Sequence, residues 1–292
     1  MNIFFDYCKY SNDLCVISYT CLGVSYCGIA LRYVDDFQLY TFILGCVPYD
    51  AISHSAVHLR EFVNRVLNEY KLQLETTKLV VTDNEPKMLS AFRDQCSRVR
   101  CSDHYLSKQL QHAFESEQIH LNRNTVEKVD CDLAQNTFNQ VKKIVSSVRR
   151  SHQQRKLSRQ LQMYSQTRFG GAIIMLNIFR DVFFELPEVL SNTKVVDDYN
   201  MIDKELLDEI CDFLEAFDEV IVALNEDKQP SLHRVLPFRQ HLLNKCEVKE
   251  GDSMAITQLK VFLGEKRIPL NISLIDLRKR VMSYRSDIIS SS

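Results

Sequence analysis

The chain has 292 residues, of which 45% are apolar, and contains few glycines and prolines. This length and composition can bury a large core, so we expect one or two globular units. A formal net charge of −2 argues against a histone-like or polybasic protein. The ten cysteines lack the spacing of a disulfide scaffold, and we find neither a secretory leader nor an apolar run of the roughly 18 to 20 residues that span a membrane. We therefore expect a soluble, intracellular protein with reduced thiols.

The first part of the chain predicts a β-sheet. Segments rich in β-branched and aromatic residues are joined by short polar links, which favours antiparallel hairpins. These segments cover residues 15–20, 26–33 and 37–44. Residues 3–8 are compatible with one further strand.

Helices and short strands then alternate. Apolar residues at helical spacing predict a helix over 54–70, with Ser53 available as its N-cap. The segment 79–82, LVVT, is short and apolar, so it predicts a buried strand, and because it follows a helix we expect it to run parallel to a neighbour. The elements expected next are a helix from Asn84 to Arg93, a strand over 98–101 and a helix that begins at His104. This order describes an antiparallel meander extended by parallel strands, which is the ribonuclease H-like plan.

Beyond about residue 141 the pattern becomes helical and the charges are sorted along the chain. Helices are predicted over 141–163, 170–184, 202–225, 232–245, 253–264 and 271–289. No acid occurs within 141–168, whereas 181–227 holds fifteen acids against two lysines. The basic residues of the first segment are Lys142, Lys143, Arg149, Arg150, Arg155, Lys156, Arg159 and Arg168.

Several short motifs occur in the order found in one transposase family. They are HSA at 54–56, VTDN at 81–84, CSDHYL at 101–106, TRFGGAIIML at 167–176, and FLEAFDEV with QPSLHRVLP within 213–237. Together they resemble the hAT superfamily, the group of hobo, Activator and Tam3. The resemblance implies an α/β ribonuclease H-like core, interrupted after its fifth strand by a large all-α insertion. We expect the core at residues 1–120 and the insertion at 121–292.

The resemblance also implies a metal-dependent site made by three carboxylates. Such a site holds two divalent ions, Mg²⁺ or Mn²⁺, that activate the attacking oxygen and stabilise the leaving one. Asp83 matches the second carboxylate, although an Asp here could also cap the helix that starts at Asn84. Asp6 is the candidate for the first, with Cys8 where the family has Trp.

The first carboxylate has an alternative position. If the strand at 15–20 pairs with 26–33 through the shortest hairpin, its place falls near Tyr19, which cannot ligate Mg²⁺ as a carboxylate would. Asp6 would then be a surface residue at a strand end.

No residue can be nominated for the third carboxylate, a Glu in the family. The predicted helix 271–289 contains only Asp276 and Asp287, and the expected closing segment, which carries that Glu and a dimerisation surface, does not follow. Three acids in the helical half, Glu205, Glu209 and Glu215, are better interpreted as a solvated helix face.

The spacing of Cys101 and His104 is compatible with a pair of zinc ligands, and Cys96 and His112 occur nearby in the sequence. A structural zinc site needs two tight ligand pairs, whereas this segment has one pair and two scattered residues. We therefore expect His104 to line the pocket beside the catalytic centre, as the resemblance implies, rather than to bind a metal.

The basic residues of 141–168 could follow a phosphate backbone, each contact adding a salt-dependent increment to binding. Phe169 replaces a Trp that the family places near the DNA, and its ring could still stack on a base. The alternative is an ordinary solvated helix face. The absence of acids in this run favours nucleic acid.

From these observations we expect a nuclear, hAT transposase-derived protein that associates with DNA or chromatin proteins, without transposase activity and without a cofactor. One alternative is an active transposase that uses Mg²⁺ or Mn²⁺ and receives its last carboxylate from a longer chain. Another is a protein-interaction scaffold that uses the acidic segment 181–227. The sequence leaves the oligomeric state and the DNA sequence open.

Overall fold

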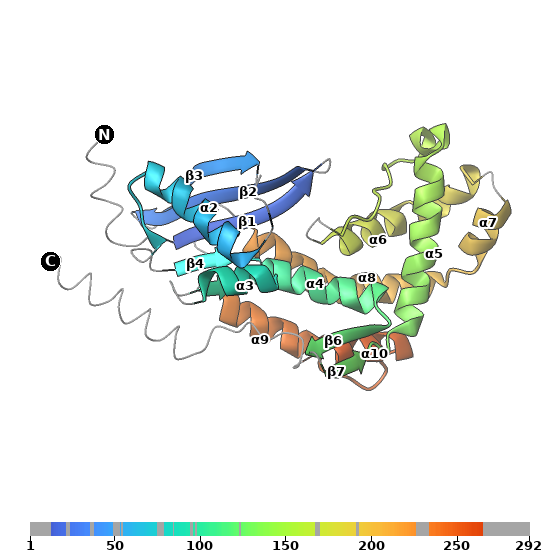
Figure 1. Cartoon of the computed structure of the whole chain (residues 1–292). Coiled ribbons are helices and arrows are strands. Elements are labelled where there is room, and N and C mark those ends of the chain that lie inside the picture. Colours follow the sequence, from blue (N-terminus) through green and yellow to red (C-terminus); the bar gives the residue numbers. More distant parts are fainter. Residues whose placement is uncertain are drawn as a thin grey trace. The chain divides into compact units, whose positions relative to one another are not determined.

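The computed structural model describes residues 13–264 with short gaps (Figure 1). The gaps are 22–23, 36–37, 49–52, 54, 75–78, 84, 94–95, 97, 123, 167–169, 191–192 and 226–233. The described chain divides between Cys101 and Ser102 into two compact units. We call residues 13–101 the sheet unit and 102–264 the helical unit.

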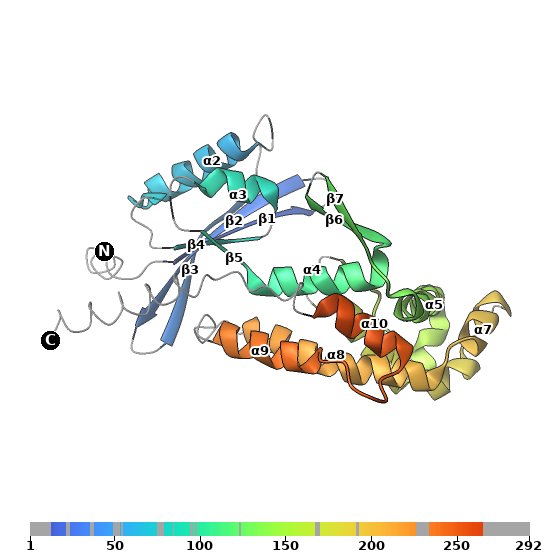
Figure 2. The same ribbon diagram turned by 90° about the horizontal axis from the view of Figure 1, so that it is seen from below.

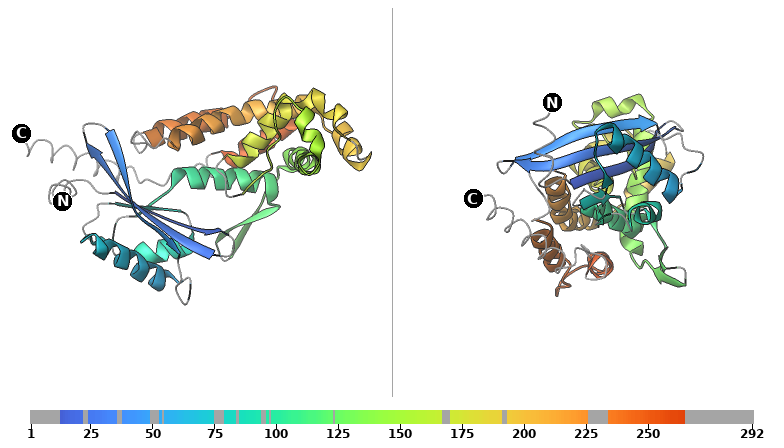
Figure 3. Two further views of the ribbon diagram at one scale, coloured as in Figure 1. Left: turned by 90° about the horizontal axis from the view of Figure 1, so that it is seen from above. Right: turned by 60° about the vertical axis from the view of Figure 1, so that its left-hand side comes forward.

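The sheet unit is built on five strands in the order β3-β2-β1-β4-β5. The strands are β1 (Asp13–Cys21), β2 (Val24–Asp35), β3 (Gln38–Pro48), β4 (Leu79–Thr82) and β5 (Arg98–Arg100). The first three form an antiparallel meander, whose twist is visible in blue in Figure 3, and β4 and β5 continue the sheet in parallel beside β1. The predicted meander and the predicted parallel direction of β4 are both confirmed.

Two helices, α2 (Ala56–Glu69) and α3 (Pro86–Phe92), cover one face of this sheet (Figure 2). The core between them contains Val16 and Val80 from the strands, Val63 from α2 and Met88 from α3, each fully buried. These apolar contacts outweigh the weak helix propensity of so short a helix as α3.

The N-cap predicted for α2 is wrong by two residues. Ser55, not Ser53, occupies the N-cap, and its side chain accepts a hydrogen bond from the backbone N–H of His58 at 3.3 Å. Ser53 instead bonds the imidazole Nδ1 of His58 at 2.7 Å. A serine three residues before the donor has the reach of a normal cap, whereas Ser53 lies too early in the chain.

The helical unit follows with a mixture of α-helices, short 3₁₀ helices and one hairpin. Its elements are α4 (Ser102–Glu115), β6 (Gln118–Asn122), β7 (Thr125–Lys128), α5 (Asp132–Arg149), η2 (His152–Lys156), α6 (Gly171–Asp181), η3 (Phe183–Glu188), α7 (Thr193–Asn200), α8 (Lys204–Leu224), α9 (Val235–Lys245) and α10 (Met254–Leu263). In Figure 2, α10 lies between α4 and α8, which agrees with its packing against both.

Most predicted helices of this unit are confirmed, but the helix expected over 141–163 is wrong at both ends. The observed α5 begins nine residues earlier, at Asp132, and ends at Arg149. The helix stops because Ser151 adopts an extended conformation and caps η2 through the backbone N–H of Gln153. The hairpin β6–β7 and the helix α7 were not predicted. The segments 3–8 and 271–289 lie outside the described residues.

The division between the units falls earlier than the boundary after residue 120 that the sequence suggests. The helix α4 packs in the helical unit, because Leu106, Leu110 and Phe114 on one of its faces are buried with the apolar residues of α5 and α8. Among the described residues, no helix is both long enough and apolar enough to cross a membrane.

Three rings form the centre of the contact between α4 and α5. The Phe138 ring stacks on Phe114 at a centroid distance of 5.0 Å, and Tyr164 meets it edge-on at 5.2 Å. Phe138 is fully buried. The packing of the helical unit should therefore depend strongly on this side chain.

We predict that Phe138→Ala destabilises the protein by about 3–5 kcal/mol, since it removes a buried ring and leaves a cavity. The measurement is urea unfolding followed by far-UV circular dichroism. Leu133→Ala is the matched control, because Leu133 lies on the same helix and is 41% exposed. A similar loss in both variants would contradict the central role of Phe138.

Candidate functional site

The first candidate site is the carboxyl end of β4, where Asp83 follows Thr82. Both residues are buried, at 8% and 1% exposure. Arg98 fixes this end of the strand, because its Nε donates to Thr82 Oγ1 at 2.7 Å and its Nη2 donates to the carbonyl of Asp83 at 2.5 Å. Cys101 N–H adds a bond to the carbonyl of Thr82 at 2.8 Å. The backbone that presents Asp83 is thus held from two sides.

The carboxylate of Asp83 serves the turn that precedes α3, but it is not the helix cap. Its Oδ1 accepts the backbone N–H of Glu85 at 3.1 Å, whereas the N-cap is Glu85 and Pro86 occupies the first turn. The interpretation of Asp83 as the cap of a helix that starts at Asn84 is therefore wrong. Proline has no N–H to satisfy, which lowers the need for a side-chain cap at this position.

The strand β4, which ends just before Asp83, lies between β1 and β5, and its register with β1 shows which residues of β1 lie beside it. Val16 pairs with Thr82 in the parallel ladder, so the next position along β1 is Ile17. The hairpin with β2 is tight and pairs Tyr19 with Tyr26, which is the second of the two alignments considered for the first carboxylate. After Asp13, β1 contains no Asp or Glu.

The other predicted carboxylates give no further information, because Asp6, Asp276 and Asp287 lie outside the described residues. Within the described part of the chain, no group of three or more His, Cys, Asp or Glu side chains is placed to hold a metal ion. Asp83 alone does not supply the oxygen ligands of a two-metal site.

The cysteines and histidines around β5 and α4 are engaged locally. His104 lies half-buried in the first turn of α4. The Cys96 thiol faces the carbonyl of Phe92 at 3.7 Å, and burial raises the pKa of this thiol. His112 bonds Ser116 Oγ through Nδ1 at 2.9 Å. The role of His104 in lining a pocket stays a prediction.

One titratable residue in this stretch was not singled out from the sequence. Asp103 is only 4% exposed, and neither of its carboxylate oxygens makes a hydrogen bond of normal geometry with a described residue. Burial raises the pKa of Asp103 to about 7, and the nearby side chain of Asn225 offsets this only in part. An Asp in the first turn of a helix is usually a solvated capping residue, so nothing in the sequence signals its burial.

The second candidate site is the basic run that begins in α5. Three cations of the run are paired with acids of the protein: Lys142 pairs with Glu115 at 2.6 Å, Lys143 pairs with Asp198 at 3.6 Å, and Arg159 pairs with Asp181. Their predicted contacts with DNA stay predictions. The ammonium of Lys142 also lies 4.9 Å from the centroid of the Tyr164 ring. Moving Lys142 onto a phosphate would therefore cost an internal ion pair and a cation–π contact.

Four cations of the run remain exposed and make no ion pair with a described residue. They are Arg149 and Arg150 at the end of α5, and Arg155 and Lys156 in η2. We call these four residues the exposed basic cluster. Arg168 and Phe169 lie outside the described residues, so their predicted contacts with DNA stay predictions.

Glu115 accepts hydrogen bonds from several side chains beside this run. The sequence alone did not predict this role of Glu115. Burial alone would raise the pKa of its carboxyl, but hydrogen bonds from Lys142, Gln166, Gln111 and Tyr164 outweigh burial, and the pKa is lowered. Gln111, Tyr164 and Gln166 also line a small pocket. The only sequence signal is the four-residue spacing of Gln111 and Glu115 on one helix face.

The residues on either side of positions 167–169 make specific contacts. Gln166 donates to Glu115 Oε2 at 2.8 Å on one side. On the other side Gly170 has a positive φ of 63°, and a Cβ at Gly171 would lie 2.6 Å from the carbonyl oxygen of Ser165. The pair of glycines therefore permits a turn that other residues would strain.

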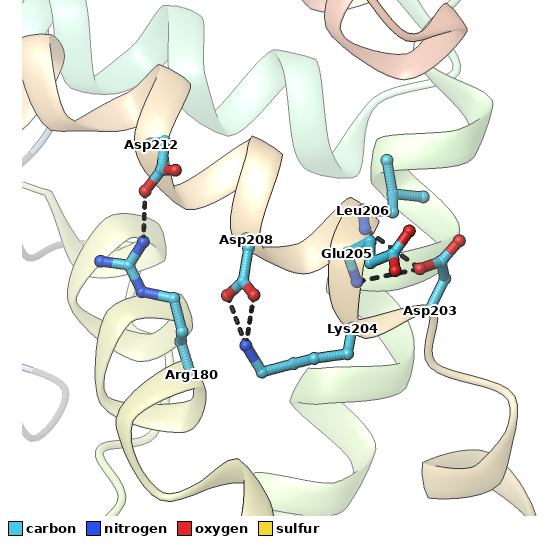
Figure 4. Close-up of polar contacts among 7 residues, drawn as sticks. All are labelled: Arg180, Asp203, Lys204, Glu205, Leu206, Asp208 and Asp212. Carbon is cyan, nitrogen blue, oxygen red and sulfur yellow. Dashed lines mark hydrogen bonds and ion pairs between the residues drawn. The ribbon is translucent and has the colours of Figure 1, made fainter.

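The acidic helix α8 is a partly neutralised surface. Lys204 pairs with Asp208 and Arg180 pairs with Asp212 at 2.6 Å, while Asp203 caps the helix through the backbone N–H groups of Glu205 and Leu206 (Figure 4). The acids interpreted as a solvated face are all exposed. These are Glu205, Glu209 and Glu215.

Comparison with known proteins gives one distant relative. No family model matches the chain. Over 243 residues it is 24% identical to the transposable element Hobo transposase of Drosophila melanogaster, a match that covers 81% of this chain and 34% of that protein. The chain thus spans about a third of the length of this relative. The similarity supports a distant relation to hAT-type transposases.

We predict that Asp103→Asn stabilises the protein by on the order of 2 kcal/mol at pH 8. The folded pKa of Asp103, about 7, lies above the unfolded value near 3.8. Between these values the folded state binds more protons, so stability falls as the pH rises from about 4 to 7, and Asn removes this loss. The measurement is urea unfolding from pH 4.5 to 8.

Asp130→Asn is the control, since Asp130 is 66% exposed at its side chain. An Asp103→Asn variant that is less stable than wild type at pH 8 would show that the carboxylate is paired rather than isolated.

Proposed function

We propose that this chain is a nuclear protein derived from a hAT-type transposase, and that it binds DNA through the exposed basic cluster without cutting it. The observation that carries the proposal is the contrast, within a single run, between three cations that are paired with acids and four exposed cations that make no ion pair with a described residue, in a chain similar to the Hobo transposase. Nuclear localisation and chromatin-bound partners follow from this proposal as expectations.

A ribonuclease H-like core is part of the proposal. The strand order β3-β2-β1-β4-β5, antiparallel in its first three strands and parallel in the last two pairings, supports it. Asp83 then stands at the carboxyl end of a parallel strand, where sheets of this kind present their functional groups. The core would serve as the scaffold that carries the helical unit.

The absence of strand transfer is proposed from the surroundings of Asp83. Two-metal chemistry needs several carboxylates that converge on one point. The strand β1, which pairs with β4, contains no Asp or Glu after Asp13. We therefore propose no cofactor for this chain.

DNA binding is proposed from electrostatics. Exposed Arg and Lys side chains displace condensed cations from the phosphate backbone, and the gain in affinity falls steeply with salt. The four residues of the exposed basic cluster lie within a stretch of eight positions, 149–156, that contains no acid. Such contacts position a protein on DNA without reading its sequence, so we expect little sequence preference.

We predict that Arg149→Ala/Arg150→Ala weakens binding to duplex DNA and lowers the salt dependence, log Kd against log salt, by up to about 1.8. Fluorescence anisotropy with a labelled duplex over several salt concentrations measures both. The control is Lys245→Ala/Lys249→Ala, which removes the same charge, with Lys245 also in the last turn of a helix. Equal losses in both variants would indicate a general charge effect and count against the cluster.

An active transposase is the second candidate, and the buried, braced position of Asp83 favours it. Under this alternative a longer chain supplies the last carboxylate. The test is whether the purified chain nicks transposon-end DNA in Mn²⁺ or Mg²⁺. Nicking that is lost in Asp83→Asn would establish this alternative and would overturn the proposal of a non-cutting protein.

A further inference from the structure

An exposed aromatic ring lies in a turn that is hydrogen-bonded to Ser158, two residues beyond the exposed basic cluster. Phe184, in η3, is 81% exposed, more than any other large apolar side chain in the described part of the chain. Single exposed apolar residues are common on protein surfaces and do not by themselves indicate a site. The reason to consider Phe184 further is how it is held and what lies beside it.

The turn that carries Phe184 is rigid. The preceding residue, Phe183, is buried at 7% exposure and packs against Phe179 and Tyr199, with centroid distances of 6.0 and 4.8 Å. Tyr199 also donates its hydroxyl to the carbonyl of Phe183 at 3.2 Å. Phe184 therefore projects from a fixed backbone, and little conformational entropy would be lost if its ring bound a ligand.

Hydrogen bonds attach this turn to the end of η2. The carboxylate of Glu185 accepts the backbone N–H of Ser158 at 2.7 Å and its hydroxyl at 2.5 Å. Ser158 is two residues beyond Lys156, and two residues span at most about 7 Å. The ring of Phe184 and the cations of η2 thus belong to one local surface.

The charges around the ring favour an anionic ligand. Asp181 is paired with Arg159 and Asp208 is paired with Lys204, whereas Glu185 keeps its negative charge while it accepts hydrogen bonds from Ser158. Glu188 is exposed. The four positive charges of the exposed basic cluster nevertheless outnumber the negative charges of Glu185 and Glu188. The ammonium of Lys204 lies 5.8 Å from the centroid of the Phe184 ring and supports it from one side.

We infer that Phe184 is a stacking platform for an unpaired base, and that the chain prefers single-stranded or locally unpaired DNA over intact duplex. Bases in a duplex are stacked on their neighbours, so an aromatic ring can add binding energy only where a base is free. A cationic track beside an exposed, rigid aromatic ring is the arrangement by which proteins hold single strands without reading their sequence. This inference rests on the proposed DNA binding and specifies the form of DNA.

The test compares a labelled single strand of about 20 nucleotides with the same sequence as a duplex, using the full chain. Phe184→Ala should weaken binding to the single strand about 5-fold or more and change duplex binding less than about twofold. The salt dependence should stay unchanged, because no charge is removed. Phe184→Trp should bind at least as well as wild type.

Two further variants distinguish base stacking from a simple apolar contact. Phe184→Leu should lose as much as Phe184→Ala, because it keeps an apolar side chain and lacks a π-face. Met254→Ala, at a residue 66% exposed in α10, should bind like wild type.

The inference would be overturned if Phe184→Ala changed the binding of neither form of DNA. It would also be overturned if Phe184→Leu bound the single strand like wild type, because an apolar contact rather than base stacking would then be sufficient. If Arg149→Ala/Arg150→Ala still weakened binding in that case, the proposed function would stand alone. A wild-type chain that binds neither form would refute the proposed function and this inference together.

Discussion

The parallel pairing of β1 with β4 is the contact on which the interpretation of the sheet unit depends. It places Thr82 opposite Val16 and brings β1 alongside the end of β4 that presents Asp83. A shift of one residue would turn every side chain of β1 to the other face, so burial of Leu14, Val16 and Val80 fixes this register. Because the register is fixed, the residues of β1 beside Asp83 are known, and none is a carboxylate.

In the helical unit the corresponding constraint is the distribution of internal ion pairs. Glu115, Asp181 and Asp198 each hold one cation of the basic run, and the Glu115 pair is partly buried among aromatic rings. Moving one of these cations to a phosphate would leave its acid unpaired, but because the cations are exposed each pair contributes only about 0–1 kcal/mol. The remaining cations lie at the end of α5 and at the end of η2, and Ser158, two residues beyond η2, is hydrogen-bonded to Glu185 in the turn of Phe184.

The sequence predicted the elements better than it predicted their contacts. Strong β-patterns and the apolar stretch LVVT identified β1 to β4 and the direction of β4, because such patterns depend on local composition. The position of the first carboxylate depended on strand pairing, which a single sequence left open between Asp6 and Tyr19. Lys142 was grouped with the exposed cations because its partners, Glu115 and Tyr164, lie far away in the chain. Burial of Asp103 depends on tertiary packing in the same way.

The central claim is that this chain contacts DNA through residues 149–156 and Phe184 rather than through the end of β4. Photo-crosslinking of the full chain to a bromouracil-containing single strand, followed by mass spectrometry of the attached peptides, tests this most directly. The account predicts crosslinks within 149–156 and at Phe184. Crosslinks concentrated around Asp83, with none in 149–156, would contradict it.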